Sequence, residues 1–250
     1  MIVLYKAKLF KYCRQDLLNN SELPINIDIP SDITYLDYDN FQGFYFIKNK
    51  ILFFFFHGSN DVKDWIDNFN IKKKDLICNG GNNHCGKVHK GFYNYYKNIQ
   101  EVFLRVIEYN LHKLDEIHIS GYSLGGSCVI AALEASYIDN CPPITVVTFG
   151  SPRVGNLKFT KLFNKRIHKS IRVVNDFDPV PRVFSFRFVH VNKLYFLREK
   201  IERYNGWFKY KWNKIKYTLF HCAKKNAFVE CHDIDEYINK LYKTNSTFFS

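Results

Sequence analysis

Apolar runs and helical patterns alternate along the chain. Residues 43–47 and Ile51–Phe56 are two early apolar runs, and the polar triplet at residues 48–50 predicts a turn between them. The second run has six consecutive apolar residues, which is typical of a strand buried on both faces of a sheet. The polar segment that begins at His57 ends this predicted strand.

The middle of the chain continues the alternation. Residues 91–114 carry apolar side chains at helical spacing, and residues 128–138 form a second, mostly apolar helical stretch. Apolar runs at residues 116–120, 144–149 and 171–174 predict further strands. Strands that alternate with helices favour an α/β fold in which a central, mostly parallel β-sheet is flanked by helices on both faces.

Three other stretches complete the outline. The polar, Gly- and Asn-rich stretch at about residues 60–87 predicts a loop or a mobile flap. Residues 186–191 and 194–197 predict a β-hairpin, and residues 230–242 predict a loop that leads into a short helix. No internal repeat or Pro/Ser-rich linker divides the chain, so we expect a single domain over residues 1–250.

Composition narrows the class of protein. With 46% hydrophobic and 24% charged residues, the composition is that of a soluble globular protein and excludes collagen-like and wholly disordered chains. No apolar run reaches the roughly 18–20 residues of a membrane span, and basic residues interrupt the N-terminal stretch, so we expect no signal peptide. Seven dispersed cysteines favour free thiols in a reducing compartment. We therefore expect an intracellular, cytoplasmic protein or one carried inside a viral particle.

A G-x-S-x-G pattern at residues 121–125 carries the chemistry. This pattern forms a tight strand-to-helix turn that projects the serine hydroxyl from a sheet, and its glycines let the two backbones approach closely. Here an apolar strand pattern precedes the motif and a helical pattern follows it. We therefore predict that Ser123 is a nucleophile; the alternative is a glycine-rich turn that only packs.

A serine nucleophile needs a base and a carboxylate that orients the base. In α/β-hydrolases the carboxylate follows the serine in the chain and the histidine comes last. Asp178 follows the predicted strand at residues 171–174 on a loop that two prolines stiffen. Asp176 is closer to the strand and fits a capping role, so Asp178 is the predicted carboxylate.

Four histidines follow the predicted nucleophile. His232 comes late in the chain, just before a predicted helix, and is the predicted base. His168 precedes Asp178 and breaks the expected order, and His190 lies inside the predicted hairpin, which indicates a structural role. His221 remains a competitor for the role of base.

Hydrolysis of an ester passes through an oxyanion, which needs preset N–H donors. One predicted donor is the backbone N–H of Leu124, directly after the nucleophile. The second is the backbone N–H of Ser59, aided by its hydroxyl, in the tight loop that follows Ile51–Phe56. Alternatively or in addition, Ser59 caps a helix at about residues 62–68.

Together these segments resemble the class 3 lipase family, the fungal-lipase-like branch of the α/β-hydrolases. The matching segments are His57-Gly58-Ser59 with Asp64-Trp65, V-H-K-G-F at 88–92, S-G-Y-S-L-G-G at 120–126, T-F-G-S-P-R-V-G-N at 148–156, D-P-V-P at 178–181, and His232 ahead of a short helix. The resemblance implies a serine ester hydrolase that acts on lipids, as a triacylglycerol lipase or a phospholipase or lysophospholipase, without a cofactor. Tyr122 departs from the family, which commonly has histidine before the nucleophile, but this position carries no proton in the mechanism.

Other functions fit the same residues. A catalytically inactive hydrolase fold would serve as a binding module, and a thioesterase or peptidase would use the same triad. Cys78, His84, Cys85 and His89 lie close in the sequence, but they lack the usual spacing of zinc ligands, so we expect no metal site. The residues do not indicate an oligomeric state.

The charge of +12 is concentrated in one segment, which begins at Arg182 and ends at Lys225. It holds twelve Lys or Arg residues, two Glu residues and several aromatic residues, and we interpret it as a basic, aromatic insertion at about residues 182–225. Such a segment beside a hydrolase site fits an anionic membrane surface. The alternative is a solvated hairpin with aromatic residues in the core. We expect no specific nucleic-acid partner, because no recognised motif is present.

Overall fold

The structure is a computed structural model that describes residues 2–12, 30–58, 72–78, 81, 83–175, 178–183, 187–191, 193–197 and 227–244. Its centre is a seven-stranded sheet with the order β1-β2-β3-β6-β7-β8-β9. These strands are β1 (Thr34–Tyr38), β2 (Phe41–Lys48), β3 (Ile51–Phe56), β6 (Glu116–Tyr122), β7 (Ile144–Phe149), β8 (Lys169–Asn175) and β9 (Lys193–Leu197).

Five of the seven strands run parallel. Strands β1, β2 and β3 pair antiparallel, and β3, β6, β7, β8 and β9 pair parallel in that order. The expected mostly parallel sheet is therefore confirmed. Because parallel strands end on the same edge, the loops after β3, β6, β7 and β8 come together at one end of the sheet.

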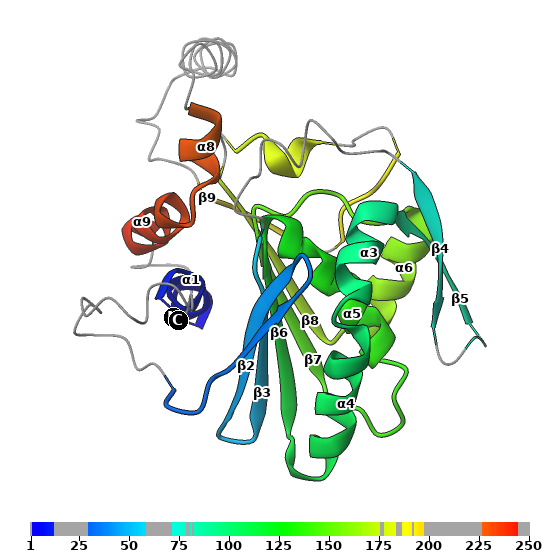
Figure 1. Ribbon diagram of the computed structural model, residues 1–250. Helices are drawn as coiled ribbons and strands as arrows, with labels where there is room; N and C mark the ends of the chain where they lie inside the picture. The colour runs from blue at the N-terminus through cyan, green and yellow to red at the C-terminus, as the bar shows by residue number, and fades with distance from the viewer. Residues whose placement is uncertain are drawn as a thin grey trace.

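Helices cover both faces of this sheet (Figure 1). On one face lie α3 (Lys90–Lys97), α4 (Gln100–Asn110), α5 (Cys128–Ala135) and α6 (Leu157–Arg166), and on the other lie α1 (Ile2–Tyr12) and α9 (Ile234–Thr244). Short helical segments are η1 (Leu111–Lys113), η2 (Ser123–Ser127), η3 (Val180–Arg182) and α8 (Ala227–His232). Among the described residues, every helix falls short of the length and apolarity that crossing a membrane demands.

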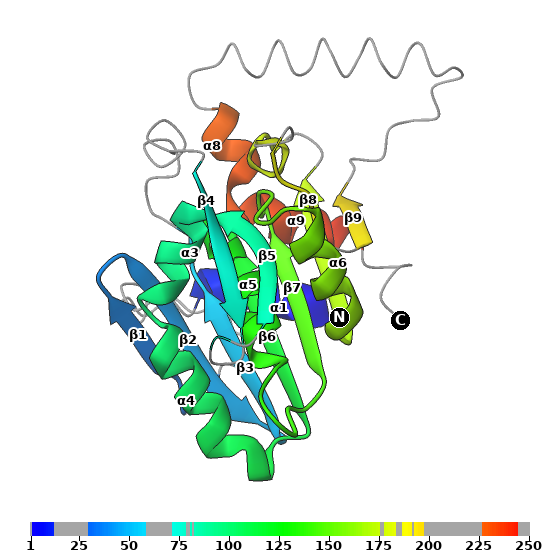
Figure 2. The same cartoon turned by 90° about the vertical axis from the view of Figure 1, so that its right-hand side faces the viewer.

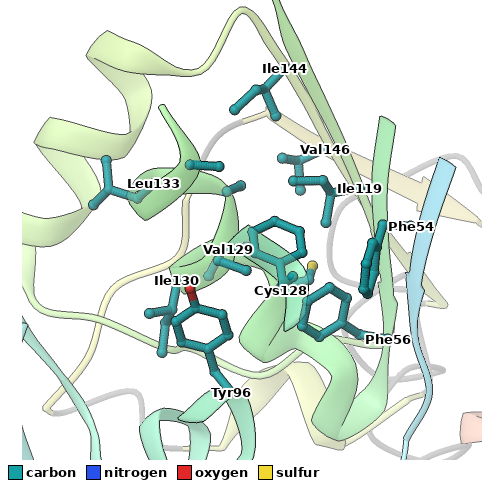
Figure 3. Packing of buried hydrophobic residues seen from close by; sticks show 14 of the residues in the cluster. Phe54, Phe56, Tyr96, Ile119, Cys128, Val129, Ile130, Leu133, Ile144 and Val146 are labelled. Atoms are coloured by element: carbon teal, nitrogen blue, oxygen red, sulfur yellow. The ribbon is translucent and has the colours of Figure 1, made fainter. Parts of the chain in front are cut away.

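The core has two halves, one on each face of the sheet. Strand β3 serves both, because Phe54 and Phe56 belong to the cluster under α3–α6 whereas Phe53 and Phe55 belong to the cluster under α1 and α9. This alternation follows from the two-residue period of a strand. Figure 3 shows the first cluster, in which residues of α5 such as Val129 pack against Phe56 of β3 and Ile119 of β6.

The expected flap differs from the structure in its second half. β4 (Lys73–Cys78) and β5 (Asn83–His89) form an antiparallel hairpin. Leu76 and Cys85 are buried in the core, while Lys73 and Asp75 are exposed. The polar appearance of this stretch comes from the exposed residues of two strands, so the prediction of a loop there was wrong.

Two further expectations are corrected. The predicted hairpin at residues 186–197 is absent from the described residues of that stretch, because β9 pairs parallel with β8 and Val189 forms only an isolated bridge with Gly155. The single helix predicted for residues 91–114 is divided into α3, α4 and η1.

Candidate active site

Ser123 is the first residue of η2, in the tight turn that joins β6 to α5. Its φ of 55° is in the left-handed region, which costs energy for a non-glycine residue and marks the strained turn that the motif requires. Gly125 makes the turn possible, because a Cβ there would lie 1.9 Å from the carbonyl oxygen of Phe56. The neighbouring central strand therefore packs directly against the turn.

Asp178 and His232 come together from distant parts of the chain. His232 Nδ1 lies 2.8 Å from Asp178 Oδ2, and both side chains are buried. The same carboxylate oxygen accepts a hydrogen bond from the hydroxyl of Tyr237 at 2.5 Å, and Oδ1 accepts one from the backbone N–H of Val180 at 2.9 Å. The carboxylate is thus held on both oxygens, and it orients the imidazole through Nδ1.

Gly150 follows directly after β7. Because it has no side chain, it leaves the space that the side chains of His232 and Asp178 occupy. Its φ is 58°, and a Cβ at this position would lie 2.8 Å from His232 Cε1 and 2.9 Å from Asp178 Oδ2. A side chain there would therefore push the imidazole or the carboxylate out of place.

The segment that carries His232 is anchored through its backbone. The Asn175 side chain donates to the carbonyl of Cys231 at 2.8 Å, and the Tyr122 hydroxyl donates to the carbonyl of His232 at 2.6 Å. Lys240 of α9 donates to the Asn175 side chain at 2.8 Å. The first two bonds satisfy carbonyls at the end of the short helix α8, which have no partner within the helix, and the third holds the Asn175 side chain in place.

Two buried atoms of this site have no hydrogen-bond partner among the described residues. They are Ser123 Oγ and His232 Nε2, and both residues are buried. Buried polar atoms without partners are rare in proteins and often mark functional positions. Catalytic hydrogen bonds also commonly form only when substrate is bound. The arrangement provides a hydroxyl and an imidazole nitrogen that are both available to a reacting group.

The loop after β3 approaches Ser123. A Cβ at Gly58 would lie 2.7 Å from Ser123 Cβ, so the backbone of Gly58 lies against the serine. Backbone bonds hold this loop, since the N–H of His57 donates to the carbonyl of Gln42 at 2.9 Å and the hydroxyl of Tyr95 donates to the carbonyl of His57 at 2.7 Å. Ser59, the predicted second oxyanion donor, follows directly but lies outside the described residues.

Leu124, the other predicted oxyanion donor, is buried and is the second residue of η2. Backbone N–H groups in the first turn of a helix have no partner within the helix and are therefore available to an anion. Its position next to Ser123 agrees with the expected role, which stays a prediction.

Arg153 anchors the loop after Asp178 through hydrogen bonds. Its guanidinium donates to the carbonyls of Arg182 at 2.9 Å and Val183 at 3.1 Å. This explains why the T-F-G-S-P-R-V-G-N segment belongs to the site: it joins the end of β7 to the loop that carries the carboxylate.

The remaining candidates have other positions. His190 Nε2 bonds the carbonyl of Pro181 at 2.7 Å, and burial together with Arg172 and Arg153 lowers the pKa of His190 to about 3. His89 accepts from the N–H of Gly91 at 2.9 Å and caps α3. Both therefore have structural roles.

The described residues contain no group of His, Cys, Asp or Glu side chains that could hold a metal ion. Asp176 and His221, the alternatives for carboxylate and base, lie outside the described residues, as does most of the basic segment between residues 182 and 225.

Three contributors to the site were not predicted from the sequence. Tyr237 and Asn175 had no local signal, because neither belongs to a motif and each contacts residues more than 50 positions away. Tyr122 had a signal, its departure from the family pattern, but its contact with His232 depends on how α8 packs.

Comparison with known proteins identifies relatives of this chain. A family model described as "Lipase (class 3)" matches residues 53–188. A secreted mono- and diacylglycerol lipase of Fusarium solani is 32% identical over 149 residues, covering 56% of this chain and 42% of that protein. The chloroplastic phospholipase A(1) DAD1 of Arabidopsis thaliana is 31% identical over 147 residues, covering 51% of this chain and 32% of that protein. The chain thus spans less than half the length of these two relatives.

Solved structures show the same fold. The lipase of Rhizopus microsporus var. chinensis superposes with a TM-score of 0.66 at 19% identity, covering 78% of this chain and 73% of that chain. The Rhizomucor miehei lipase propeptide complex superposes with a TM-score of 0.62 at 23% identity, covering 77% of this chain and 66% of that chain.

Proposed function

The chain belongs to the class 3 lipase family, and from this premise we propose that it is a serine carboxylic-ester hydrolase that acts on lipids. The observation that carries the proposal is the buried pair of Asp178 and His232, whose free Nε2 and the free Ser123 Oγ lie at the same end of the sheet. In this proposal Ser123, Asp178 and His232 form the triad, and no cofactor or metal takes part.

The reaction proceeds in two halves. His232 Nε2 accepts the hydroxyl proton as Ser123 Oγ attacks the ester carbonyl, and Asp178 stabilises the imidazolium that forms. The N–H groups of Leu124 and Ser59 bind the oxyanion. The imidazolium then protonates the leaving alcohol, and water releases the acyl group from Ser123 by the same steps.

Substitution of the nucleophile tests this proposal most directly. Ser123→Ala should lower kcat for short p-nitrophenyl esters by at least about 10⁴-fold, while circular dichroism stays unchanged. A fluorophosphonate probe should label the wild-type protein on Ser123 and leave the variant unlabelled. Labelling or hydrolysis that persists in Ser123→Ala would show that the chain uses another nucleophile.

The carboxylate assignment has its own control. Asp178→Asn should lower kcat by roughly 10⁴-fold because the imidazole loses its orientation, whereas Asp176→Asn should leave most of the activity. The opposite result would assign the role to Asp176.

Two classes of lipid are the candidate substrates. The two relatives are named as a mono- and diacylglycerol lipase and a phospholipase A(1), so acylglycerols and phospholipids are the substrates to compare. A profile over both classes, with Ser123→Ala as the blank, distinguishes them. A binding module would hydrolyse neither, and a thioesterase or peptidase would prefer thioesters or peptides.

An anionic membrane surface is the partner that we propose for docking. The segment from Arg182 to Lys225 holds twelve basic and two acidic residues. The described part of the chain adds a second basic surface: β4, β5, α3 and α6 carry nine exposed Lys or Arg residues and a single acidic residue, Asp75. Figure 2 shows β4, β5 and α6 facing the viewer with α3 beside them. Positive charges gathered on one face attract anionic lipid headgroups.

Vesicle sedimentation tests the membrane partner. The protein should bind phosphatidylserine-containing vesicles at low salt, bind them less at high salt, and leave phosphatidylcholine vesicles unbound. Charge reversal at Lys73, Lys74 and Lys87 should weaken binding if the described surface contributes. Equal, negligible binding to both vesicle types would reject the membrane partner.

We also propose an intracellular, reducing location, although the Fusarium relative is named as secreted. The five cysteines among the described residues are free, as expected in a reducing compartment. Alkylation of the unreduced, denatured protein should modify all seven cysteines of the chain. Protection of a pair of them would indicate a disulfide and an oxidising location.

A further inference from the structure

Tyr122, the residue before the nucleophile, contacts the histidine of the site in two ways. Its hydroxyl donates to the backbone carbonyl of His232 at 2.6 Å. Its ring also stacks on the imidazole, with ring centres 5.2 Å apart and planes 20° from parallel. One side chain therefore fixes both the backbone and the ring of a residue 110 positions later in the chain.

The contacts of Tyr122 complement those of Asp178. The Asp178 carboxylate holds the imidazole by one edge, through Nδ1, and a single hydrogen bond leaves the ring able to rock about that bond. The flat face of Tyr122 opposes this rocking. An aromatic face also attracts a positive charge, so the same stack favours the imidazolium over the neutral ring.

The hydroxyl of Tyr122 stays protonated and therefore stays a donor. Burial, followed by the negative charges of Asp178, Asp233 and Asp235, raises the pKa of Tyr122 far above its ordinary value. The bond to the carbonyl of His232 is thus preserved across the pH range in which an ester hydrolase operates.

We propose that Tyr122 is a positioning residue that holds His232 in the orientation needed to take the proton of Ser123. The inference rests on the proposed function of the triad. A tyrosine that only fills space would behave differently, because it would affect the stability of the fold without affecting the chemical step. Tyr122 also lies near Phe10 of α1, with ring centres 6.2 Å apart, so both roles need to be separated by experiment.

Three variants separate these roles. Tyr122→Leu removes the ring and the hydroxyl, and Tyr122→Phe removes only the hydroxyl. Tyr45→Leu is the control for packing, because Tyr45 is a partly buried strand tyrosine that stacks on Phe54, with ring centres 5.5 Å apart. Each variant is assayed for kcat, KM, the pH dependence of kcat/KM, and Tm.

Tyr122→Leu should lower kcat by roughly 10- to 100-fold with KM nearly unchanged, because Tyr122 acts on the base and leaves substrate binding alone. The acid limb of its pH profile should move to lower pH, since the imidazolium loses the aromatic face. Tyr122→Phe should keep the position of the acid limb and recover most of kcat. Tyr45→Leu should lower Tm while kcat and the pH profile stay as in the wild type.

A second measurement does not depend on activity. The Hε1 resonance of His232, assigned by its loss in His232→Asn, should move in Tyr122→Leu as the ring current of Tyr122 disappears, and stay close to its wild-type position in Tyr122→Phe.

The experiments distinguish failure of the positioning role of Tyr122 from failure of the proposed function. If wild-type protein hydrolyses esters and Tyr122→Leu retains wild-type kcat and acid limb, the positioning role is wrong and the triad stands. If wild-type protein neither hydrolyses esters nor reacts with a fluorophosphonate, the proposed function is wrong and the positioning role fails with it.

Discussion

Beneath α3, α4, α5 and α6 the sheet is packed by a large cluster of apolar side chains, whereas on the face under α1 and α9 the side chain of Lys6 is fully buried. Phe103, for example, lies in the first cluster with its ring centre 5.0 Å from that of Phe54. On the other face Lys6 is fully buried, and the buried ring of His118 has its centre 5.0 Å from that of Phe53.

The two faces also support different halves of the site. Leu124 and Cys128, which continue the turn after Ser123, belong to the cluster under α3–α6. Tyr122 and Tyr237, which contact His232 and Asp178, belong to the cluster under α1 and α9. One face thus combines an apolar cluster with the turn that presents Ser123, and the other combines a buried lysine with the residues that contact His232 and Asp178.

Lys6 is buried at a cost in stability. It is fully buried, and its Nζ has no hydrogen-bond partner among the described residues. Burial lowers the pKa of Lys6 from 10.5 to about 7, and Lys169 adds to the lowering, while Cys128 and Glu116 oppose it. His118, beside Lys6, has a pKa lowered to about 4, mainly by burial and then by Lys6 itself.

The largest effect is expected from Phe103→Ala. Removing this buried ring should lower the free energy of unfolding by about 3–5 kcal/mol through lost transfer energy and a cavity, with kcat of the folded protein nearly unchanged. Urea unfolding and initial rates at low temperature measure the two effects. Tyr109→Ala on the same helix is the control, because Tyr109 is 80% exposed. A large loss of kcat in folded Phe103→Ala would contradict this expectation.

A smaller effect of opposite sign is expected from Lys6→Met. A buried charge replaced by an apolar side chain of similar length should raise the free energy of unfolding by about 1–4 kcal/mol at pH 7 and below.

The pH dependence of this gain sharpens the test. Because the pKa of Lys6 is lowered in the folded state to about 7 from 10.5, the unfolded wild type binds more protons between these values. Wild-type stability therefore rises with pH across that window, and the gain in Lys6→Met should fade toward pH 10.5. Lys161→Met, at an exposed position of α6, is the control. A gain that is equal at all pH values would show that the pKa of Lys6 is the same in the folded and unfolded states.

The smallest effect on stability is expected from Tyr237→Phe. Asp178 loses one donor but keeps the N–H of Val180 and the contact with His232, so the free energy of unfolding should fall by about 1–3 kcal/mol. Since the carboxylate is less firmly placed, kcat should fall by roughly tenfold. Tyr242→Phe on the same helix, at a site 52% exposed, should change neither quantity. An unchanged kcat in Tyr237→Phe would restrict the catalytic support of this face to Tyr122.

Much of the fold was predictable for elements whose structure depends mainly on their own local sequence. The six apolar residues of β3 and the strand–turn–helix around Ser123 both appear as expected. The β4–β5 hairpin was missed because the exposed residues Lys73, Lys74 and Asp75 make the stretch resemble a polar loop. The pairing of β9 was missed because the residue pattern of a strand does not specify which strand it pairs with. β9 pairs with β8 across a long connection.

For the site, the sequence by itself determined the turn that presents Ser123 and the order of the candidate residues, because glycines and apolar runs act over a few neighbouring positions. Only the tertiary structure decided which groups surround them. Asp178, His232 and Tyr237 meet because α9 packs on the sheet and holds α8 near the loop after β8, and Tyr122 reaches His232 for the same reason. Such contacts depend on the relative positions of elements far apart in the chain, and no local pattern of residues encodes those positions.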